Sequence, residues 1–313
     1  MRFILTLLVC LGVAATVWPN HAMAVTDTVP FRKTERGLLL VDVRINDRGP
    51  FPFLIDTGAT TSVIFEPLAQ RLNLEQTQNT YAMVHGIVES GEHPLTQLDR
   101  LRMGSAQVTD LEAIVLKSPS VQRDWVGIIG LNFLSEFVLV FDNDNQTLTL
   151  YNHDDVPRRL FSGWRKLPVY HDTTLKRPFK LLFVPVRVDG KKIDALIDLG
   201  STTLILNWPG ARRIGLERLY RRLEEKWLVE GATGEFRPRT VLKDGEIKIG
   251  RLTATGSMLI VDTKALRELN RQDVPFLILS AGLFGQGAFA VDVTTPAVYL
   301  KVFSTARPPA TIR

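Results

Sequence analysis

The sequence predicts an all-β protein made of two homologous β-barrel lobes related by a pseudo-two-fold axis. Short alternating apolar and polar runs, separated by turn residues, recur along the chain, and long helical patterns are almost absent. This combination is typical of barrels. In addition, the stretch at 53–64 occurs a second time at 195–206. Such a long period indicates two homologous domains rather than a solenoid, whose units have roughly 20–50 residues.

The two copies of the repeat align without a gap well beyond their shared centre. Asp198 follows Asp56 by 142 positions, and the same offset relates Pro67 to Pro209. Weaker matches extend toward both ends of each half with small shifts in the offset. Each half is therefore predicted to fold as one lobe.

The first 24 residues have the features of a secretory signal peptide. A basic Arg2 precedes an apolar run at 3–17, and a small-x-small motif ends at Ala24, where we expect cleavage. The alternative is a membrane anchor, but the run is shorter than the roughly 20 residues that a spanning helix needs. We therefore expect no stable membrane insertion after cleavage. Cys10 is the only cysteine, so its loss with the signal favours a periplasmic or secreted bacterial protein.

Length and composition allow two ordinary domains. The chain has 313 residues, of which 45% are hydrophobic, enough for two cores. The net charge of +5 comes from scattered basic residues, which predicts no nucleic-acid partner. The predicted divisions are a signal peptide at 1–24, an N-terminal lobe at 25–151, a linker at 152–163, a C-terminal lobe at 164–305 and a tail at 306–313.

The expected elements follow the same order in both halves. Residues 25–37 are polar and are expected to be loose. Turn residues and apolar alternation then define the strands, and a proline suits the first turn of each short helix. In the first half we expect strands at 38–45, 51–55, 98–103 and 108–116, an apolar glycine-bearing stretch at 126–131 followed by a helical turn, two strands within 137–150, a helix at 66–72 and a hairpin at 81–91. In the second half we expect strands at 182–188 and 193–197, helices at 209–215 and 217–226, a hairpin tip at 231–234 and an apolar stretch at 276–283.

Each copy of the repeat leads an apolar strand into one carboxylate, Asp56 or Asp198. A buried ionised carboxylate costs several kcal/mol unless it is compensated. If the two turns face each other, the carboxyl groups share a proton, so that one acts as a base and the other as an acid. Such a pair suits activation of a water and protonation of a leaving amine. The alternative is a pair of surface turns, but the apolar lead-in and the repeat favour a joint site.

The pattern resembles the retropepsin-like and pepsin-like aspartic proteases. Residues 54–59 carry the apolar-apolar-Asp-Thr-Gly-Ala signature of that family, and residues 128–130 carry its apolar-apolar-Gly element. The resemblance covers nearly all of the chain after Ala24, as two retropepsin-like lobes with the active cleft between them. It implies that Asp56 and Asp198 are the catalytic dyad, without a metal or organic cofactor. It also implies a flap, with His85 and Gly86, that closes on an extended protein or peptide substrate.

The residues around the two aspartates are not equivalent. Leu199 replaces the Thr or Ser of the family, whose hydroxyl bonds across to the other lobe, and residues 279–282 blur the second apolar-Gly element. Ser201 can donate a hydrogen bond to Asp198, which favours its ionised form. We therefore expect Asp56 to carry the shared proton. The residues expected to support the two active-site turns are Thr57, Gly58, Ala59, Leu199, Gly200 and Ser201.

Three functional hypotheses remain open on the sequence. The first is a monomeric aspartic endopeptidase that cuts proteins or peptides, and the presence of Asp198 favours it. The second is a non-catalytic peptide-binding module on the same fold. The third is a homodimeric protease that uses only the Asp56 lobe, and Leu199 favours the second and third. His85 lacks the spacing of a metal-ligand motif, so no metal is expected.

Overall fold

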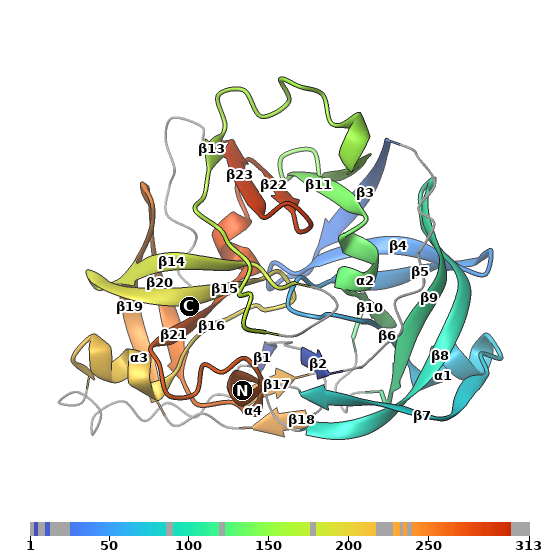
Figure 1. Cartoon of the computed structure of the whole chain (residues 1–313), viewed down its shortest axis with the longest axis horizontal. Coiled ribbons are helices and arrows are strands. Elements are labelled where there is room, and N and C mark those ends of the chain that lie inside the picture. The colour runs from blue at the N-terminus through green and yellow to red at the C-terminus, as the bar shows by residue number, and fades with distance from the viewer. Residues whose placement is uncertain are drawn as a thin grey trace.

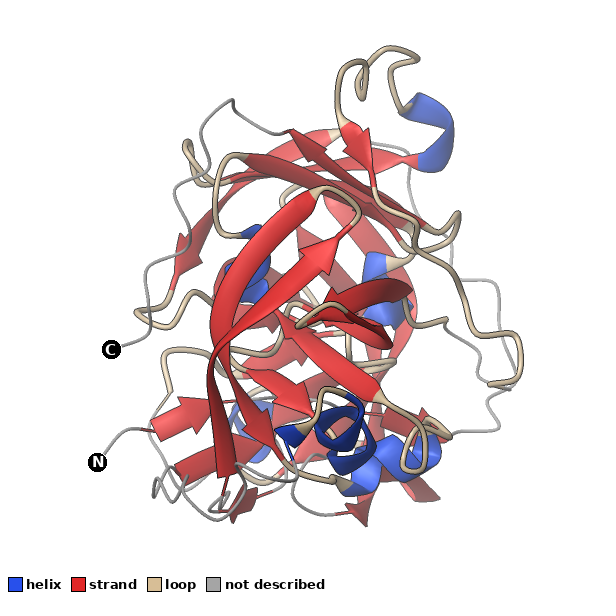
Figure 2. Ribbon diagram, turned by 90° about the vertical axis from the view of Figure 1, so that its left-hand side faces the viewer, coloured by secondary structure: helices blue, strands red, loops and turns tan. Residues whose placement is uncertain are grey.

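The structure is a computed structural model that describes residues 26–85, 90–118, 123–175, 180–216 and 240–301, with short strands at 3–5, 10–12, 228–231 and 234–236. Strands dominate the described chain and its helices are short (Figure 2), which confirms the all-β class. Several predicted features lie wholly or mostly outside the described residues. These are the signal peptide, the flap tip at Gly86, the helix at 217–226, the centre of the 231–234 turn and the tail at 306–313.

The first lobe is a ring of six strands (Figure 1). The ring runs β4-β5-β10-β6-β9-β8, and β8 pairs back with β4. The short β10 lies parallel to β5 and antiparallel to β6. The strands are β4 (Leu39–Ile45), β5 (Arg48–Ile55), β10 (Gly127–Ile129), β6 (Ser62–Phe65), β9 (Ala106–Leu116) and β8 (Ser90–Met103).

The second lobe repeats this topology strand for strand. Its closed barrel runs β14-β15-β21-β16-β20-β19, and β21 lies parallel to β15 and antiparallel to β16. The internal repeat in the sequence is therefore a repeat of architecture, which confirms two homologous barrels. The strands are β14 (Phe183–Val188), β15 (Lys191–Asp198), β21 (Phe276–Ser280), β16 (Leu204–Leu206), β20 (Leu252–Ile260) and β19 (Thr240–Ile249).

Local sequence explains these elements. Along β4, Val41 and Val43 face the core while Asp42 and Arg44 are exposed, the alternation of a half-buried strand. In the second lobe, the Asn207 side chain caps a helix by accepting a 2.8 Å hydrogen bond from the Gly210 amide. The helices are α1 (Glu66–Arg71), α2 (Leu131–Leu134), α3 (Trp208–Arg213) and α4 (Lys264–Glu268), with a 3-10 turn η4 at Ala281–Phe284.

A six-stranded antiparallel sheet joins the lobes in the order β3-β12-β11-β22-β23-β13. Its central pair, β11 with β22, is centred on Val140 and Ala290, which occupy matching positions of the two halves. The rings of Phe141 and Phe289 stack across this seam at 4.5 Å. This register is what a pseudo-two-fold axis between the lobes requires. The strands are β3 (Asp27–Lys33), β12 (Thr147–Asn152), β11 (Phe137–Asp142), β22 (Ala288–Asp292), β23 (Ala297–Lys301) and β13 (Arg165–Lys166).

The expectation that residues 25–37 are loose is wrong. β3 lies between β12 and β4, and its backbone pairs with both. Phe31, which is buried, fixes this strand in the core. The segment therefore extends the interlobe sheet and connects it to the first barrel.

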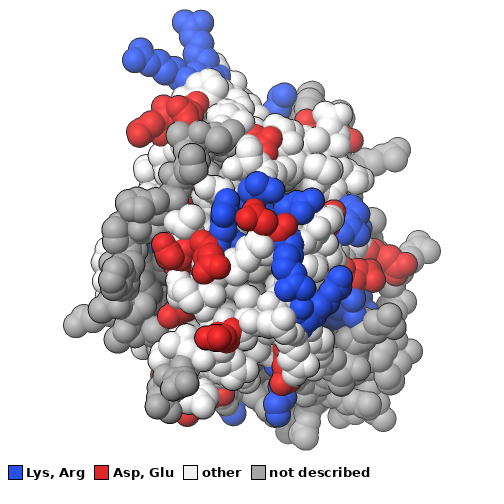
Figure 3. All heavy atoms as spheres, turned by 90° about the vertical axis from the view of Figure 1, so that its right-hand side faces the viewer, with Lys and Arg blue, Asp and Glu red and all other residues white. Residues whose placement is uncertain are grey.

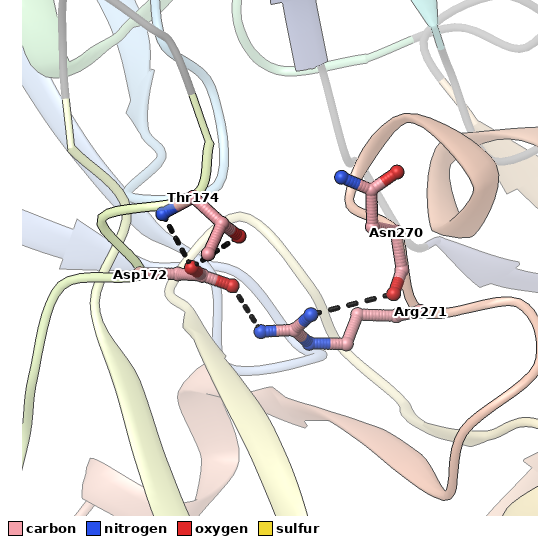
Figure 4. Close-up of polar contacts among 4 residues, drawn as sticks. All are labelled: Asp172, Thr174, Asn270 and Arg271. Carbon is pink, nitrogen blue, oxygen red and sulfur yellow. Dashed lines mark hydrogen bonds and ion pairs between the residues drawn. The ribbon is translucent and has the colours of Figure 1, made fainter.

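The chain between the lobes is fastened to the second lobe by an ion pair. After the 3-10 turn η1 (His153–Asp155) and β13, the Asp172 carboxylate pairs with Arg271, next to α4. Asp172 Oδ1 also accepts hydrogen bonds from the amide and hydroxyl of Thr174, and Arg271 donates to the Asn270 carbonyl (Figure 4). The Arg271 guanidinium lies 5.4 Å from the ring centre of Phe183. These contacts hold the connecting segment on the barrel.

Each lobe also carries a hairpin. In the first lobe β7 (Gln76–His85) pairs with β8, and in the second lobe β17 (Leu228–Gly231) pairs with β18 (Gly234–Phe236). The short strands β1 (Phe3–Leu5) and β2 (Cys10–Gly12) pair with β17 and β7. No helix in the described ranges has the length and apolarity needed to cross a membrane.

Candidate active site

Both candidate aspartates stand where an apolar strand ends. Asp56 directly follows β5, and Asp198 is the last residue of β15. The Asp56 amide donates to the carbonyl of Ile129 on β10 over 3.0 Å, which ties the turn to the neighbouring strand. Both side chains have 0% relative exposure. The barrel architecture thus places two carboxyl groups inside the protein.

The structure brings the two turns face to face. A β-carbon added at Gly200 would lie only 2.3 Å from Cγ of Asp56 and 2.4 Å from its Oδ2. The Asp56 carboxyl group therefore packs directly on the backbone of the opposite turn, and only glycine leaves room for it. The two carboxyl groups also lie close enough that each perturbs the ionisation of the other. These contacts are what a shared-proton pair requires.

Backbone amides orient both carboxylates. Asp56 Oδ1 accepts hydrogen bonds from the amides of Gly58 at 2.7 Å and Ala59 at 3.1 Å. Asp198 Oδ1 accepts a hydrogen bond from the amide of Gly200 at 2.9 Å, and the Ser201 amide also favours the ionised form of Asp198. Neither Oδ2 atom has a hydrogen-bond partner among the described residues. Each carboxyl group thus keeps one oxygen for the partner carboxyl, a water or a substrate.

Burial perturbs both acids. It raises the pKa of Asp56 to about 7, against the opposing effect of the Gly58 and Ala59 hydrogen bonds. Burial, and then the charge of Asp56, raises the pKa of Asp198 well above its usual range. Both acids therefore keep a proton to a higher pH than an exposed aspartate does.

The expectation that Asp56 carries the shared proton relied on a hydrogen bond from the Ser201 hydroxyl to the Asp198 carboxylate. In the structure the Ser201 hydroxyl donates instead to the Thr203 carbonyl, over 2.7 Å. The predicted hydrogen bond is wrong because the hydroxyl satisfies a carbonyl inside its own turn, and the position of the shared proton stays a prediction.

Thr57 bridges the lobes in the middle of the site. Its Oγ1 donates to the Ile197 carbonyl at 2.9 Å and accepts from the Leu199 amide at 3.1 Å. All of these groups are buried, so the two bonds fix the turns relative to each other. Leu199 has no hydroxyl to return the bridge, and its side chain is buried in the core. The two active-site turns are therefore bridged by one threonine side chain rather than two.

Strand pairing shows which residue of the second lobe corresponds to the glycine of the apolar-apolar-Gly element. β21 pairs with β15 in the same register as β10 pairs with β5, which places Ser280 at the position of Gly130. A β-carbon at Gly130 would lie 2.6 Å from the carbonyl carbon of Thr61, so that position in the first lobe needs glycine. In the second lobe this position carries the buried side chain of Ser280.

A polar network behind the first turn was missed from the sequence. The amide and hydroxyl of Ser62 donate to Oδ1 of Asn132 at 2.9 and 2.7 Å. The Gly130 amide donates to the Ser62 hydroxyl at 3.1 Å. The repeat-related residues of the second lobe, Leu204 and Gly282, cannot form these side-chain bonds. A polar Asn directly after an apolar-Gly stretch is the sequence signal that could have indicated this network.

The proposed flap is only partly described. The backbone of His85 ends β7, opposite Ser90 of β8, while Gly86 lies outside the described residues. In the part of the chain that the structure describes, no group of three His, Cys, Asp or Glu side chains is arranged to hold a metal ion.

Comparisons with known proteins match both halves separately. A family model described as a gag-polyprotein aspartyl protease matches residues 41–136. A second model, described as an aspartyl protease, matches residues 184–289. A retropepsin-like aspartic protease from Rickettsia conorii matches at 16% identity and a TM-score of 0.29, covering 43% of this chain and 97% of that protein. No curated protein sequence matches the chain. Each half of the chain therefore matches an aspartyl protease family, and the chain carries two aspartyl protease domains in tandem.

Proposed function

We propose that the protein is an aspartic endopeptidase that hydrolyses peptide bonds in proteins or peptides with a water activated between Asp56 and Asp198. The observation that carries this proposal is the packing of the Asp56 carboxyl group on the opposing turn at Gly200. The match of each half to an aspartyl protease family supports the reaction class. The mutual perturbation of two buried acids supports the use of one proton by both.

The charge of ionised Asp56 adds to burial in raising the pKa of Asp198, which supports Asp198 as the carrier of the shared proton. Ionised Asp56 accepts a proton from the water while the water oxygen bonds to the scissile carbonyl carbon. At the same time Asp198 donates its proton to the carbonyl oxygen. When the tetrahedral intermediate collapses, the proton on Asp56 passes to the leaving nitrogen, the C–N bond breaks, and Asp198 regains its proton from the diol. Because the Asp56 pKa is about 7, the rate should rise with pH through this region.

We also propose the oligomeric state, the substrate class and the cellular location of the enzyme. Both aspartates come from one chain, which supports a monomer with an extended protein or peptide as its substrate. The basic start, apolar run and small-residue motif of residues 1–24 support export to the periplasm or the medium. N-terminal sequencing of the exported protein tests this part, with Val25 as the expected first residue.

Peptide-library cleavage across pH tests the reaction. Asp56→Asn and Asp198→Asn should each lower the rate by about 10³-fold or more, because each removes one side of the acid–base pair. Asp42→Asn, at an exposed carboxylate of the same lobe, is the control and should keep full activity. Loss of cleavage activity in Asp56→Asn but not in Asp198→Asn would favour a homodimer in which only the first lobes form active sites. A folded wild-type protein that cuts nothing would favour the peptide-binding module.

A further inference from the structure

A groove of about 440 Å³ lies on the outer side of the first lobe, where β5 begins beside α1. Apolar side chains make up most of its lining, including Phe51 and Pro52 of β5 and Pro67 and Leu68 of α1. Its volume is within the range of roughly 300–1,000 Å³ that is typical of ligand pockets. The groove begins one strand length from the aspartates, so it is separate from the candidate active site.

Two arginines line the same groove, Arg48 from β5 and Arg71 from the end of α1. Arg48 Nη2 donates to the Arg71 carbonyl at 2.9 Å, and the Arg71 guanidinium lies 5.6 Å from the ring centre of Phe51. These contacts orient both side chains at the groove. Figure 3, which shows this side of the molecule, has Lys and Arg side chains gathered around a few acidic ones.

Neither arginine has an acidic partner among the described residues, although neighbouring charges do. Arg100, on β8, pairs with Asp47 at 3.4 Å. Each guanidinium carries five N–H donors, and the contacts above use one of those on Arg48. Two oriented guanidiniums beside an apolar wall are complementary to a carboxylate that follows an apolar side chain.

The repeat-related surface of the second lobe lacks this combination. At the offset of 142 positions, Arg213 corresponds to Arg71, but Asp194 stands at the position of Pro52. Burial, and then the Asp194 carboxylate, raises the pKa of the neighbouring Tyr170 hydroxyl to about 12. At this position the second lobe has the carboxylate of Asp194, next to Tyr170 of the connecting segment. The first lobe has the apolar side chain of Pro52 there instead.

We propose that the groove binds a peptide segment in which a carboxylate adjoins an apolar side chain, with the side chain on Phe51 and Pro52 and the carboxylate on Arg48 and Arg71. This inference rests on the proposed function, because the segment would belong to a peptide substrate held outside the cleavage site. The carboxylate can be a chain terminus or an Asp or Glu side chain. A substrate that reaches both places must also span β5 from Phe51 to Asp56, about 17 Å of extended chain. Short peptides should therefore be cut without using the groove.

Fluorescence anisotropy with the full-chain Asp56→Asn variant tests binding without cleavage. The probes are fluorescein-labelled Gly-Ala-Pro-Leu with a free carboxylate, the same peptide as its amide, and the amidated peptide Gly-Ala-Leu-Glu-Ala. We expect at least one carboxylate probe to bind about tenfold or more tightly than the amide of Gly-Ala-Pro-Leu. Preference for the first or third probe identifies a terminal or side-chain carboxylate. Equal binding of all three probes would overturn the proposal.

Matched variants locate the binding. In the Asp56→Asn background, Arg48→Gln and Arg71→Gln together should remove the preference for carboxylate probes over the amide. Arg213→Gln, at the position that corresponds to Arg71 in the repeat, should leave this preference unchanged. If the double variant has a lower melting temperature, the Arg48→Lys and Arg71→Lys pair keeps both charges and should still weaken binding severalfold. An unchanged preference in both double variants would overturn the proposal. Cleavage of a short peptide by otherwise wild-type protein, with and without the double change, should be equal. Absence of all cleavage would count against the proposed function, and the anisotropy result would stand.

Discussion

The two aspartate turns share one backbone plan but differ in their polar support. In the first lobe two amides hold the Asp56 carboxylate, and Thr57 reaches across to the other turn. In the second lobe the Gly200 amide donates to Asp198, and the position of the bridging hydroxyl is occupied by the buried Leu199. Polar support favours the ionised form of an acid, and apolar surroundings favour the neutral form. A duplicated fold can thus give two equivalent acids different surroundings without changing its architecture.

The largest effect is expected where the turns touch. Gly200→Ala would place a β-carbon 2.3 Å from the Asp56 carboxyl carbon, so the two turns must move apart. We expect activity to fall by about 10²-fold or more and the free energy of unfolding to fall by about 1–3 kcal/mol. Gly282→Ala is the control, because its added carbon would be 3.7 Å from the nearest atom. Peptide-cleavage kinetics and thermal melting measure both changes. Equal activity and equal stability of the two variants would contradict the close contact between Gly200 and the Asp56 carboxyl group.

The next effect concerns stability and pH. Asp56 and Asp198 keep protons in the folded protein that the unfolded chain releases above its ordinary pKa of 3.8. The free energy of unfolding should therefore decrease as pH rises from about 4 to about 7. Asp198→Asn removes one of the two buried acids with raised pKa values, so it should be more stable than wild type at pH 7 and its stability should depend less on pH. Denaturant unfolding at pH 4 and pH 7 measures this, and parallel pH curves for wild type and the variant would refute it.

A smaller loss is expected from the bridge between the turns. Thr57→Val keeps the shape of the side chain but leaves the Ile197 carbonyl and the Leu199 amide without their partner. We expect the free energy of unfolding to fall by about 2 kcal/mol, with a lower cleavage rate. Thr60→Val, in the same turn, is the control, because its buried hydroxyl has no hydrogen-bond partner among the described residues. It should be neutral or slightly stabilising. A Thr60→Val variant as unstable as Thr57→Val would argue against a special role for the bridge.

The smallest effect tests the assignment of the proton. Ser201→Ala removes a hydrogen bond to the Thr203 carbonyl and none to the Asp198 carboxylate. We expect a loss of about 1 kcal/mol in unfolding free energy and an unchanged pH dependence of kcat/KM. A shift of its acidic limb would show that the Ser201 hydroxyl stabilises the ionised form of the pair.

The repeat made most of this architecture predictable. Apolar strands that lead into Asp56 and Asp198 are local signals, and their recurrence requires the two turns to be equivalent in space. The structure confirms the all-β class and the two barrels. It also places the two aspartates together, while their catalytic role remains a prediction.

Features that depend on distant partners could not be predicted in the same way. β3 is polar, and its strand conformation comes from pairing with β12 and β4. The Ser201 hydroxyl had two possible acceptors, and only the folded turn shows that the Thr203 carbonyl receives it. The Ser62–Asn132 network joins residues 70 positions apart. Such contacts follow from the packed structure rather than from local pattern.

The seam between β11 and β22 has a consequence for how the enzyme behaves at low concentration. In a site shared by two separate chains, dilution separates the halves and abolishes the site. Here the halves belong to one polypeptide and are also joined through the backbone pairing centred on Val140 and Ala290. Each aspartate therefore meets its counterpart at an effective concentration that does not depend on how many molecules are present. Turnover per molecule should be the same in a crowded compartment and after release into a large volume.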